Sequence, residues 1–338
     1  MLNNKNILIS GGTGSFGNKF LDIVLKKYKP KRIIVYSRDE YKQFLMKEKY
    51  PLNKFPSLRF LIGDVRDKER LTLAMKDVDC VVHAAALKQV PAAEYDPMEF
   101  VKTNIYGAEN IIQASIYQKV KKIIALSTDK AANPLNLYGA TKLASDKIFT
   151  AANNIVGSQN TKFSVVRYGN VLGSRGSVVP IFRDYIRQGK GYLPITDKNM
   201  TRFWITLEEG VNFVIKSFFR MDGGEIYVPK IPSIKIMDLA RAMKTNPKIK
   251  IIGVRPGEKV HELMCPGEYS DFTYEFKDHY VILSQIHKST SGSKKNYLKN
   301  RIGELGKKVS KNFEYSSDKN THFLSIKEIQ KLNNKLKD

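Results

Sequence analysis

The sequence predicts an α/β protein, with a Rossmann-type doubly wound parallel sheet and a smaller C-terminal substrate-binding lobe. Apolar, β-branched runs recur with helical patterns between them, which is typical of a parallel sheet covered by helices on both faces. A glycine-rich turn directly follows the first run, where dinucleotide-binding folds place their phosphate loop. The expected strands cover residues 7–9, 33–36, 58–62, 80–82, 123–126 and 163–166.

The strand–helix alternation loosens after residue 170, which predicts a change of domain there. We expect a Rossmann domain over 1–170 and a substrate-binding lobe over 171–285, some of whose elements return to the Rossmann domain. The remaining residues, 286–338, form a basic C-terminal segment with 13 lysines and arginines against 5 acids. Further elements are expected as helices over 207–219, 236–243 and 325–336 and a strand over 225–228.

Composition limits the possible function classes. The net charge is +24, but outside the C-terminal segment the lysines are scattered over expected helix surfaces, so we expect a solvated surface and no nucleic-acid partner. A cofactor-sensing nucleic-acid-binding protein is kept as the alternative from another class. Two cysteines, Cys80 and Cys265, cannot form a disulfide framework, which favours the cytoplasm. We find no signal peptide and no apolar run long enough for a membrane span.

The glycine turn carries the cofactor hypothesis. Gly11, Gly14 and Gly17 separate the first strand from an apolar helix pattern, and this order lets the backbone approach a pyrophosphate at the helix N-terminus. We therefore expect a dinucleotide-binding site. The other residues of this turn expected to contact the cofactor are Thr13, Ser15 and Phe16.

The end of the second strand favours NADP over NAD. An NAD site usually has an acidic residue there, whereas this chain has Ser37 and Arg38, with Lys42 one helical turn later. A hydroxyl and a guanidinium suit a 2′-phosphate, although Asp39 and Glu40 keep dual use open. Asp64 could contact the adenine or cap the next helix. Val65, Ala84, Ala86, Lys88 and Thr103 complete the expected cofactor contacts.

The fifth strand leads into a polar cluster, Thr128, Asp129 and Lys130, and a helix pattern then carries Tyr138 and Lys142. A spacing of four residues places Tyr138 and Lys142 on one helix face. A nearby ammonium favours the phenolate, so Tyr138 can remove a hydroxyl proton while a hydride leaves the same carbon. These five residues are the expected catalytic group.

The stretches Gly11–Gly17, Gly63–Arg66 and Ser127–Lys147 resemble the inverting UDP-N-acetylglucosamine 4,6-dehydratases of pseudaminic acid biosynthesis, a branch of the extended short-chain dehydrogenase/reductase superfamily. The resemblance runs from about Asn6 to Tyr280. It implies a hexameric lyase with tightly held NADP that converts UDP-N-acetylglucosamine to a 4-keto-6-deoxy sugar with inverted C5, a precursor for flagellin glycosylation.

The resemblance also implies roles for three residues. Lys130 removes the C5 proton, Asp129 protonates the departing C6 hydroxyl, and Thr128 positions the sugar. We expect Lys142 and the nicotinamide to lower the pKa of Lys130, so that it is a neutral base. Retaining dehydratases typically carry glutamate at the position of Lys130, which favours inversion. A retaining UDP-sugar 4,6-dehydratase and a nucleotide-sugar 4-epimerase remain the alternatives.

Residues outside the first domain are expected to hold the nucleotide sugar. Guanidinium groups suit a diphosphate and a carboxylate suits ribose hydroxyls. His261 has no partner at metal-ligand spacing, so no metal is expected. The candidate substrate contacts are Lys88, Asn170, Ser174, Arg202, Arg255 and Glu258.

Overall fold

The computed structural model describes residues 2–173, 177–284 and 297–335. Its centre is a ten-stranded sheet in the order β16-β14-β15-β10-β6-β5-β4-β1-β2-β3. The seven strands from β3 to β10 are parallel, and β15, β14 and β16 extend the sheet in antiparallel fashion. The strands are β1 (Asn6–Ser10), β2 (Arg32–Ser37), β3 (Leu58–Ile62), β4 (Cys80–His83), β5 (Lys122–Thr128), β6 (Lys162–Tyr168), β10 (Ile226–Pro229), β14 (Thr273–Glu275), β15 (His279–Ile282) and β16 (Lys307–Lys308).

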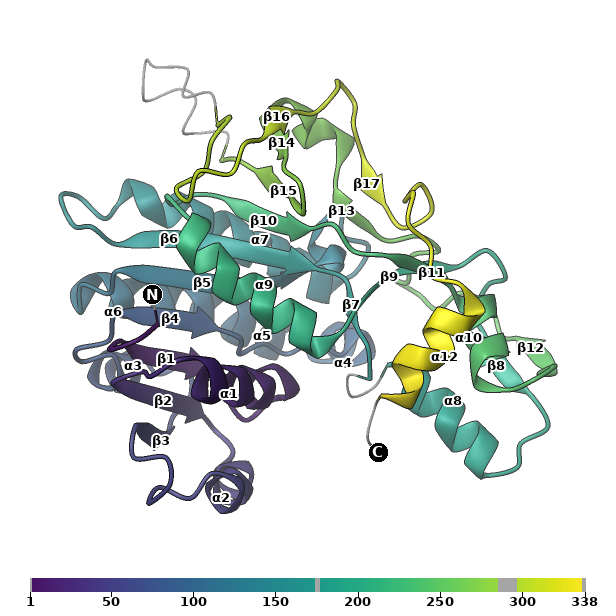
Figure 1. The fold of residues 1–338 in the computed structure, drawn as a ribbon, viewed down its shortest axis with the longest axis horizontal. Coiled ribbons are helices and arrows are strands. Elements are labelled where there is room, and N and C mark those ends of the chain that lie inside the picture. Colours follow the sequence, from purple (N-terminus) through teal and green to yellow (C-terminus); the bar gives the residue numbers. More distant parts are fainter. Residues whose placement is uncertain (1, 174–176, 285–296, 336–338) are drawn as a thin grey trace.

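Helices cover both faces of this sheet (Figure 1). Helices α1 (Ser15–Lys27) and α9 (Leu207–Arg220) pack together on one face, while α3 (Lys68–Ala74), α6 (Gly107–Tyr117) and α7 (Leu137–Ala151) lie on the other. Among the described residues, none of the helices has both the length and the apolar character needed to span a membrane. The remaining helices of this unit are α2 (Glu40–Lys49), α4 (Val90–Tyr95), α5 (Pro97–Phe100), the π-helix η1 (Val101–Tyr106) and the 3-10 helices η2 (Asp129–Ala131), η3 (Ala152–Asn154) and η4 (Gly267–Phe272).

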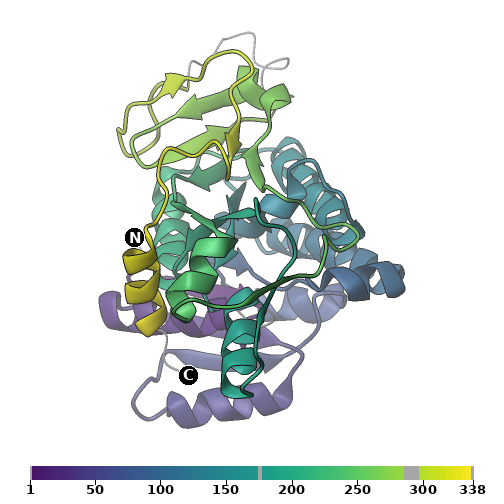
Figure 2. The same ribbon diagram turned by 90° about the vertical axis from the view of Figure 1, so that its right-hand side faces the viewer.

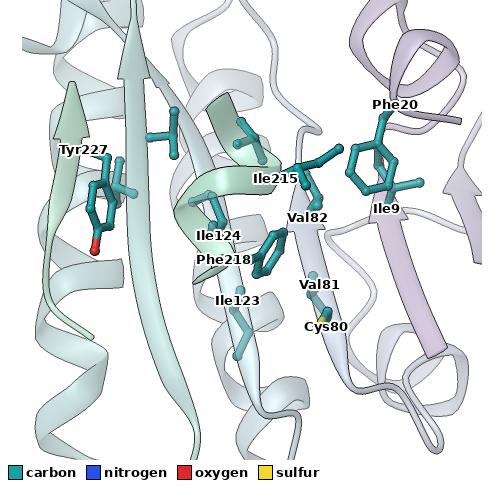
Figure 3. Packing of buried hydrophobic residues seen from close by; sticks show 14 of the residues in the cluster. Ile9, Phe20, Cys80, Val81, Val82, Ile123, Ile124, Ile215, Phe218 and Tyr227 are labelled. Atoms are coloured by element: carbon teal, nitrogen blue, oxygen red, sulfur yellow. The ribbon is translucent and has the colours of Figure 1, made fainter. Parts of the chain in front are cut away.

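Burial on both sides explains why the strand runs are continuously apolar. Side chains from the central strands, such as Ile9, Val82 and Ile124, pack against Phe20 of α1 and Phe218 of α9 (Figure 3). All five are almost fully buried. The predicted doubly wound parallel sheet is confirmed.

A second, smaller core lies beside the carboxyl edge of the sheet. Apolar side chains of α8 (Val178–Arg187), α10 (Ile236–Met243) and α12 (Ile326–Asn334) pack in one cluster with Trp204. Figure 2 shows α12 alongside α10. The C-terminal segment therefore contributes to both units, because β16 joins the main sheet and α12 joins the lobe. The elements of this lobe and its connections are α8 (Val178–Arg187), α10 (Ile236–Met243), α12 (Ile326–Asn334), β7 (Asn170–Val171), β8 (Leu193–Ile195), β9 (Thr201–Ile205), β11 (Ser233–Lys235), β12 (Ile249–Ile251), β13 (Leu263–Cys265) and β17 (Tyr315–Ser316).

A buried ion pair ties α7 to the sheet behind the site. Asp146 accepts hydrogen bonds from Arg167 Nη2 at 2.9 Å and Ser127 Oγ at 2.7 Å, and Arg167 Nη1 donates to the Met264 carbonyl at 2.9 Å. Replacing Asp146 by alanine leaves the buried guanidinium without its counterion. We expect the free energy of unfolding to fall by roughly 3–5 kcal/mol, measured by urea denaturation.

The matched control is Asp184→Ala, which removes an ion pair to Arg187 on the exposed surface of α8. Because water solvates both charges there, we expect a change of less than about 1 kcal/mol. Equal effects of the two substitutions would contradict a structural role for the buried pair.

Candidate active site

The glycine turn after β1 forms a tight cradle at the point where the strand order reverses. Gly11 has φ +66°, and a Cβ on it would lie 2.8 Å from the backbone of Ala85, in the loop after β4. A Cβ on Gly17 would lie 2.0 Å from the Gly12 carbonyl oxygen. Gly14 caps α1 without any side-chain hydrogen bond, so the first N–H groups of the helix are open to an anion. This geometry fits the pyrophosphate of a dinucleotide.

The turn after β2 gathers charges at the same edge of the sheet. The Arg38 guanidinium is half exposed and lies 3.6 Å from the Asp64 carboxylate, whereas Lys42 pairs with Asp39 within its own helix. Asp64 accepts hydrogen bonds from Arg66. Burial raises the pKa of the Asp64 carboxyl, but these hydrogen bonds and the positive charges of Arg66 and Arg38 outweigh burial and hold the pKa below its usual range. The helix after it, α3, is capped by Asp67. Helix capping by Asp64 is therefore ruled out.

The loop after β4 is fixed by a residue that no motif singled out. Asn104 exchanges hydrogen bonds with the Leu87 backbone at 2.9 Å and donates to Thr141 Oγ1 at 3.1 Å, which ties the loop to α7. Its neighbour Thr103 is buried, and its hydroxyl has no hydrogen-bond partner among the described residues. The other expected cofactor contacts lie around this loop or the glycine turn: Val65 is buried, Ala84 is half-buried, and Ala86 and Lys88 are exposed.

His83 is a structural residue of this edge. It is fully buried, shares a hydrogen bond of 2.8 Å with Ser10 Oγ, and stacks on Phe149. Burial, with a smaller effect of the Lys142 charge, lowers the pKa of His83 to about 3. The imidazole is neutral at physiological pH and joins β1 to β4.

Tyr138 and Lys142 occupy one buried face of α7, whose N-cap is Asn136. Lys142 Nζ donates to the Leu126 carbonyl at 2.8 Å. Burial raises the pKa of Tyr138 to about 12, while the Lys130 charge and a hydrogen bond with Thr128 act in the opposite direction. Among the nearby charges, Lys130 lowers the pKa of Tyr138 most, and the expected role of Lys142 stays a prediction.

Asp129 and Lys130 form a buried group with Glu262, a residue from the loop before β13. The Asp129 carboxylate accepts from Thr128 Oγ1 at 3.0 Å and from Lys130 Nζ at 3.1 Å. The same ammonium donates to Glu262 Oε1 at 3.0 Å. Two buried carboxyl groups therefore flank one ammonium at the carboxyl end of β5.

This arrangement reverses the expected shift of Lys130. Burial is the largest single effect and lowers the pKa of its ammonium, but attraction to Asp129 and Glu262 and the hydrogen bond to Glu262 together outweigh burial, so the pKa is raised. The expectation of a lowered pKa is wrong, because no sequence pattern indicated the second carboxylate, Glu262. Burial and the Glu262 charge raise the pKa of Asp129, which favours its protonated form.

A cavity of about 230 Å³ opens between the start of α7 and the smaller lobe. Lys130 and Glu262 line it, and so do Asn170 Oδ1, Ser177 Oγ and Glu258 Oε2, three buried polar atoms that have no hydrogen-bond partner among the described residues. Unpaired polar atoms around a cavity suit a polar ligand such as a sugar.

The chain matches known proteins over most of its length. Residues 7–284 fit the model of a family described as polysaccharide biosynthesis protein. An inverting UDP-N-acetylglucosamine 4,6-dehydratase of Campylobacter jejuni strain 81-176 is 58% identical over 329 residues, which cover 97% of each chain. The chain belongs to the inverting UDP-N-acetylglucosamine 4,6-dehydratase family. The motif resemblance is thereby confirmed.

Two further proteins place this dehydratase-family chain among its relatives. A UDP-glucose 4-epimerase of Rickettsia bellii is 42% identical, with coverage of 98% of this chain and 96% of its own. The X-ray structure of Pen from Bacillus thuringiensis has a TM-score of 0.87 and 38% identity, and the match covers 100% of this chain and 99% of that one.

The loop 255–262 of this dehydratase-family chain holds two of the expected substrate contacts, Arg255 and Glu258, and a third, Arg202, bonds to it. The buried Arg202 guanidinium donates to the Val260 carbonyl at 3.0 Å and the Lys259 carbonyl at 2.9 Å, and lies 3.3 Å from Glu258. Arg255 is exposed, lines the cavity and makes no side-chain hydrogen bond or ion pair within the described ranges. Arg202 thus shapes this loop, and Arg255 is the guanidinium available to an anion. Ser174 lies outside the described residues.

The loop is anchored to the catalytic helix. Asn136 Nδ2 donates to the Gly257 carbonyl at 2.7 Å. Gly257 has φ +74°, and a Cβ added to it would lie only 2.9 Å from the Asn136 side chain, so this position favours glycine. Lys259 donates to the Ala132 carbonyl beside η2. Sequence reasoning missed Glu262, Asn136 and Asn104, although the spacing from Asn136 to Gly139 does carry the signature of a helix cap.

One cluster elsewhere has the ligand types of a metal site. Asp278, His279 and Glu304 place ligand atoms within 4.8 Å of one another. Arg220 donates to both carboxylates at 2.7 Å, and Lys216 lies 2.9 Å from Asp278. These cations already compensate the carboxylate charges, so the cluster functions as an ion-pair network.

Proposed function

We propose that this chain is an NADP-dependent UDP-N-acetylglucosamine 4,6-dehydratase that inverts C5 and forms UDP-2-acetamido-2,6-dideoxy-β-L-arabino-hex-4-ulose. The observation that carries the proposal is the buried Asp129–Lys130 pair beside Tyr138, at the edge of the cavity. Elimination of water from C5 and C6 needs an acid and a base together at these carbons, whereas epimerisation at C4 needs no acid or base at C5 and C6. The Campylobacter jejuni relative is an inverting UDP-N-acetylglucosamine 4,6-dehydratase, which supports the same reaction for this chain.

In the proposed mechanism, Tyr138 accepts the proton of the C4 hydroxyl, and Thr128 holds the sugar oxygen in place. Bound NADP supplies the chemistry of taking a hydride from C4 and returning it to C6. The C4 ketone acidifies the C5 proton, which Lys130 removes, while Asp129 protonates the departing C6 hydroxyl. Delivery of a proton to the opposite face of C5 then inverts that carbon.

The test is incubation of the purified, NADP-loaded protein with UDP-N-acetylglucosamine, followed by mass and proton NMR analysis. We expect loss of one water and the coupling pattern of an inverted C5. Loss of water with retained C5 would identify a retaining dehydratase. Unchanged mass with inversion at C4 would identify an epimerase, as the Rickettsia bellii relative is named.

NADP as the cofactor is supported by Arg38 and by the open end of α1. Replacing Arg38 by alanine removes the half-exposed guanidinium nearest to the expected 2′-phosphate. We expect the Kd for NADP to rise by about tenfold to a hundredfold, because hydrogen bonds to charged groups contribute that much, with little change for NAD. Isothermal titration calorimetry measures both.

The control is Lys47→Ala, which removes a cation of the following helix, α2, that lies over the Phe60 ring. It should leave both affinities nearly unchanged. Equal losses of NAD and NADP affinity in the Arg38 variant would contradict recognition of a 2′-phosphate.

The remaining proposals rest on the family. We infer a cytoplasmic homohexamer that performs the first step of pseudaminic acid biosynthesis for flagellin glycosylation, with UDP-N-acetylglucosamine as its partner and neither nucleic acid nor membrane as a ligand. We propose that residues 1–170 form the NADP-binding domain, 171–285 the substrate-binding lobe and 286–338 a basic C-terminal segment. Within the second range, α9 and β10 return to the main sheet. Size-exclusion chromatography with light scattering tests the assembly.

A further inference from the structure

Glu262 lies beside Lys130 in the candidate active site, although the proposed mechanism gives it no role. Its side chain is 2% exposed, and Oε1 lies 3.0 Å from Lys130 Nζ and 3.7 Å from Arg202 Nε. It also lines the cavity, and Oε2 has no hydrogen-bond partner among the described residues. A buried carboxylate with a free oxygen, in contact with the proposed base, can take part in its proton transfers.

The backbone of Glu262 is held from two sides. Its N–H donates to Ser317 Oγ at 2.9 Å, and its carbonyl accepts from the Ser317 N–H at 2.8 Å. The Ser317 hydroxyl lies 2.7 Å from Thr201 Oγ1 of β9. The carboxylate is therefore fixed in front of Lys130 by β9 and by the chain after β17.

The charges around Glu262 decide which groups carry protons. Lys130, Asp129, Arg202 and Lys259 are the charged groups that face it. Burial raises the pKa of Glu262, but Lys130 and Arg202 together outweigh burial and lower it. Burial and the Glu262 charge thus favour the protonated form of Asp129, while Lys130 and Arg202 favour the carboxylate form of Glu262.

We propose that Glu262 is the positioning carboxylate of the elimination step, which accepts a proton from Lys130 Nζ and thereby converts this lysine into a neutral base while Asp129 keeps its proton. The inference rests on the proposed function. It explains how an ammonium flanked by two carboxyl groups becomes able to remove the C5 proton.

The protons balance through the step. An N–H bond of Lys130 breaks as an O–H bond forms on Glu262. The C5–H bond then breaks as a new N–H bond forms on Lys130. The electron pair of the C5–H bond forms the C5–C6 double bond, and the C6–O bond breaks and leaves its electron pair on the oxygen. Asp129 gives its proton to that oxygen, which leaves as water.

The group then returns to its starting state. A solvent-derived proton adds to the opposite face of C5, Glu262 releases its proton to solvent while Lys130 remains an ammonium, and the proton released from the C4 hydroxyl restores Asp129. No further oxidant or reductant is required, because the hydride taken from C4 is the one delivered to C6.

Glu262→Gln tests the proposal, since it keeps the shape but removes the charge and the proton acceptor. We expect kcat to fall by about a hundredfold with KM little changed, and incorporation of solvent deuterium at C5 to slow in parallel. The loss of activity at alkaline pH should move to lower pH, because Asp129 gives up its proton more easily without the Glu262 charge. Glu262→Asp keeps a carboxylate and should retain the wild-type pH profile at reduced kcat.

Glu258→Gln is the matched control. Glu258 pairs with Arg202 and does not contact Lys130, so its loss should raise KM and leave the pH profile and the deuterium exchange at C5 unchanged. An independent readout needs no substrate: acetylation of Lys130 by acetic anhydride, followed by peptide mass spectrometry across pH. The Glu262 charge helps to raise the pKa of Lys130, so this labelling should move to lower pH in Glu262→Gln.

The outcomes separate the two proposals. If the wild-type protein converts UDP-N-acetylglucosamine but Glu262→Gln only raises KM or keeps the wild-type pH profile, the role of Glu262 is wrong and the proposed function stands. If the wild-type protein forms no product, the proposed function fails, and the Lys130 labelling still decides whether Glu262 controls that lysine. Should Glu262→Gln not fold, Glu262→Asp carries the test, and an altered pH profile of that variant would overturn the proposal.

Discussion

Replacing Lys130 by methionine is expected to lower kcat for the 4,6-dehydration by about a thousandfold, the usual contribution of a positioned base. Methionine has a similar length but cannot accept a proton, so the C5 proton stays in place. Oxidation at C4 does not need Lys130, so reduced nicotinamide should still form when the loaded variant is mixed with UDP-N-acetylglucosamine. Stopped-flow absorbance and deuterium exchange at C5 measure the two steps separately.

The control for this variant is Lys147→Met, on the exposed side of α7, which should behave like the wild type. Exchange of solvent deuterium into C5 at the wild-type rate in Lys130→Met would assign the base to another residue. A variant that also fails to oxidise C4 would show that Lys130 acts mainly through Tyr138, whose pKa it lowers.

Replacing Tyr138 by phenylalanine is expected to stop the reaction at an earlier point. Without the phenol oxygen no group accepts the C4 hydroxyl proton, so both C4 oxidation and dehydration should slow by about a thousandfold. Because burial raises the pKa of Tyr138 to about 12 in the ligand-free protein, we expect the phenol to be neutral there until ligands bind. Rapid-mixing absorbance of reduced nicotinamide is the direct measurement.

Tyr95→Phe provides the matched control, because this tyrosine is 94% exposed on α4 and the substitution removes the same atom. It should leave both rates unchanged. Normal nicotinamide reduction in Tyr138→Phe would contradict the assignment of Tyr138 as the proton acceptor.

The fold was largely predictable because burial on both faces leaves a strong sequence pattern. The run 58–62 coincides with β3, the expected helix over 236–243 coincides with α10, and the expected C-terminal helix corresponds to α12. The antiparallel strands β14 and β16 were not foreseen. They have three and two residues, too few for a period to show, and β16 pairs with a distant part of the chain.

The site was predictable where residues act through local spacing. Gly11, Thr128 and Tyr138 each follow directly from a strand end or a helix start. Glu262 was not predictable in this way, since its partner Lys130 is 132 positions away and its own neighbours form only a three-residue strand. The direction of the Lys130 pKa depends on that distant contact, so the sequence alone led to the opposite expectation.

The two hydrogen bonds between Ser317 and Glu262 have a consequence for synthesis on the ribosome. The glycine turn and the Tyr138 helix come from the first half of the chain and can form early, but the carboxylate opposite Lys130 stays without its support until residues beyond 317 emerge. A polypeptide released before that point would contain most strands of the sheet, but Glu262 would lack its hydrogen bonds to Ser317. The support of the Glu262 carboxylate therefore forms only after Ser317 has been translated.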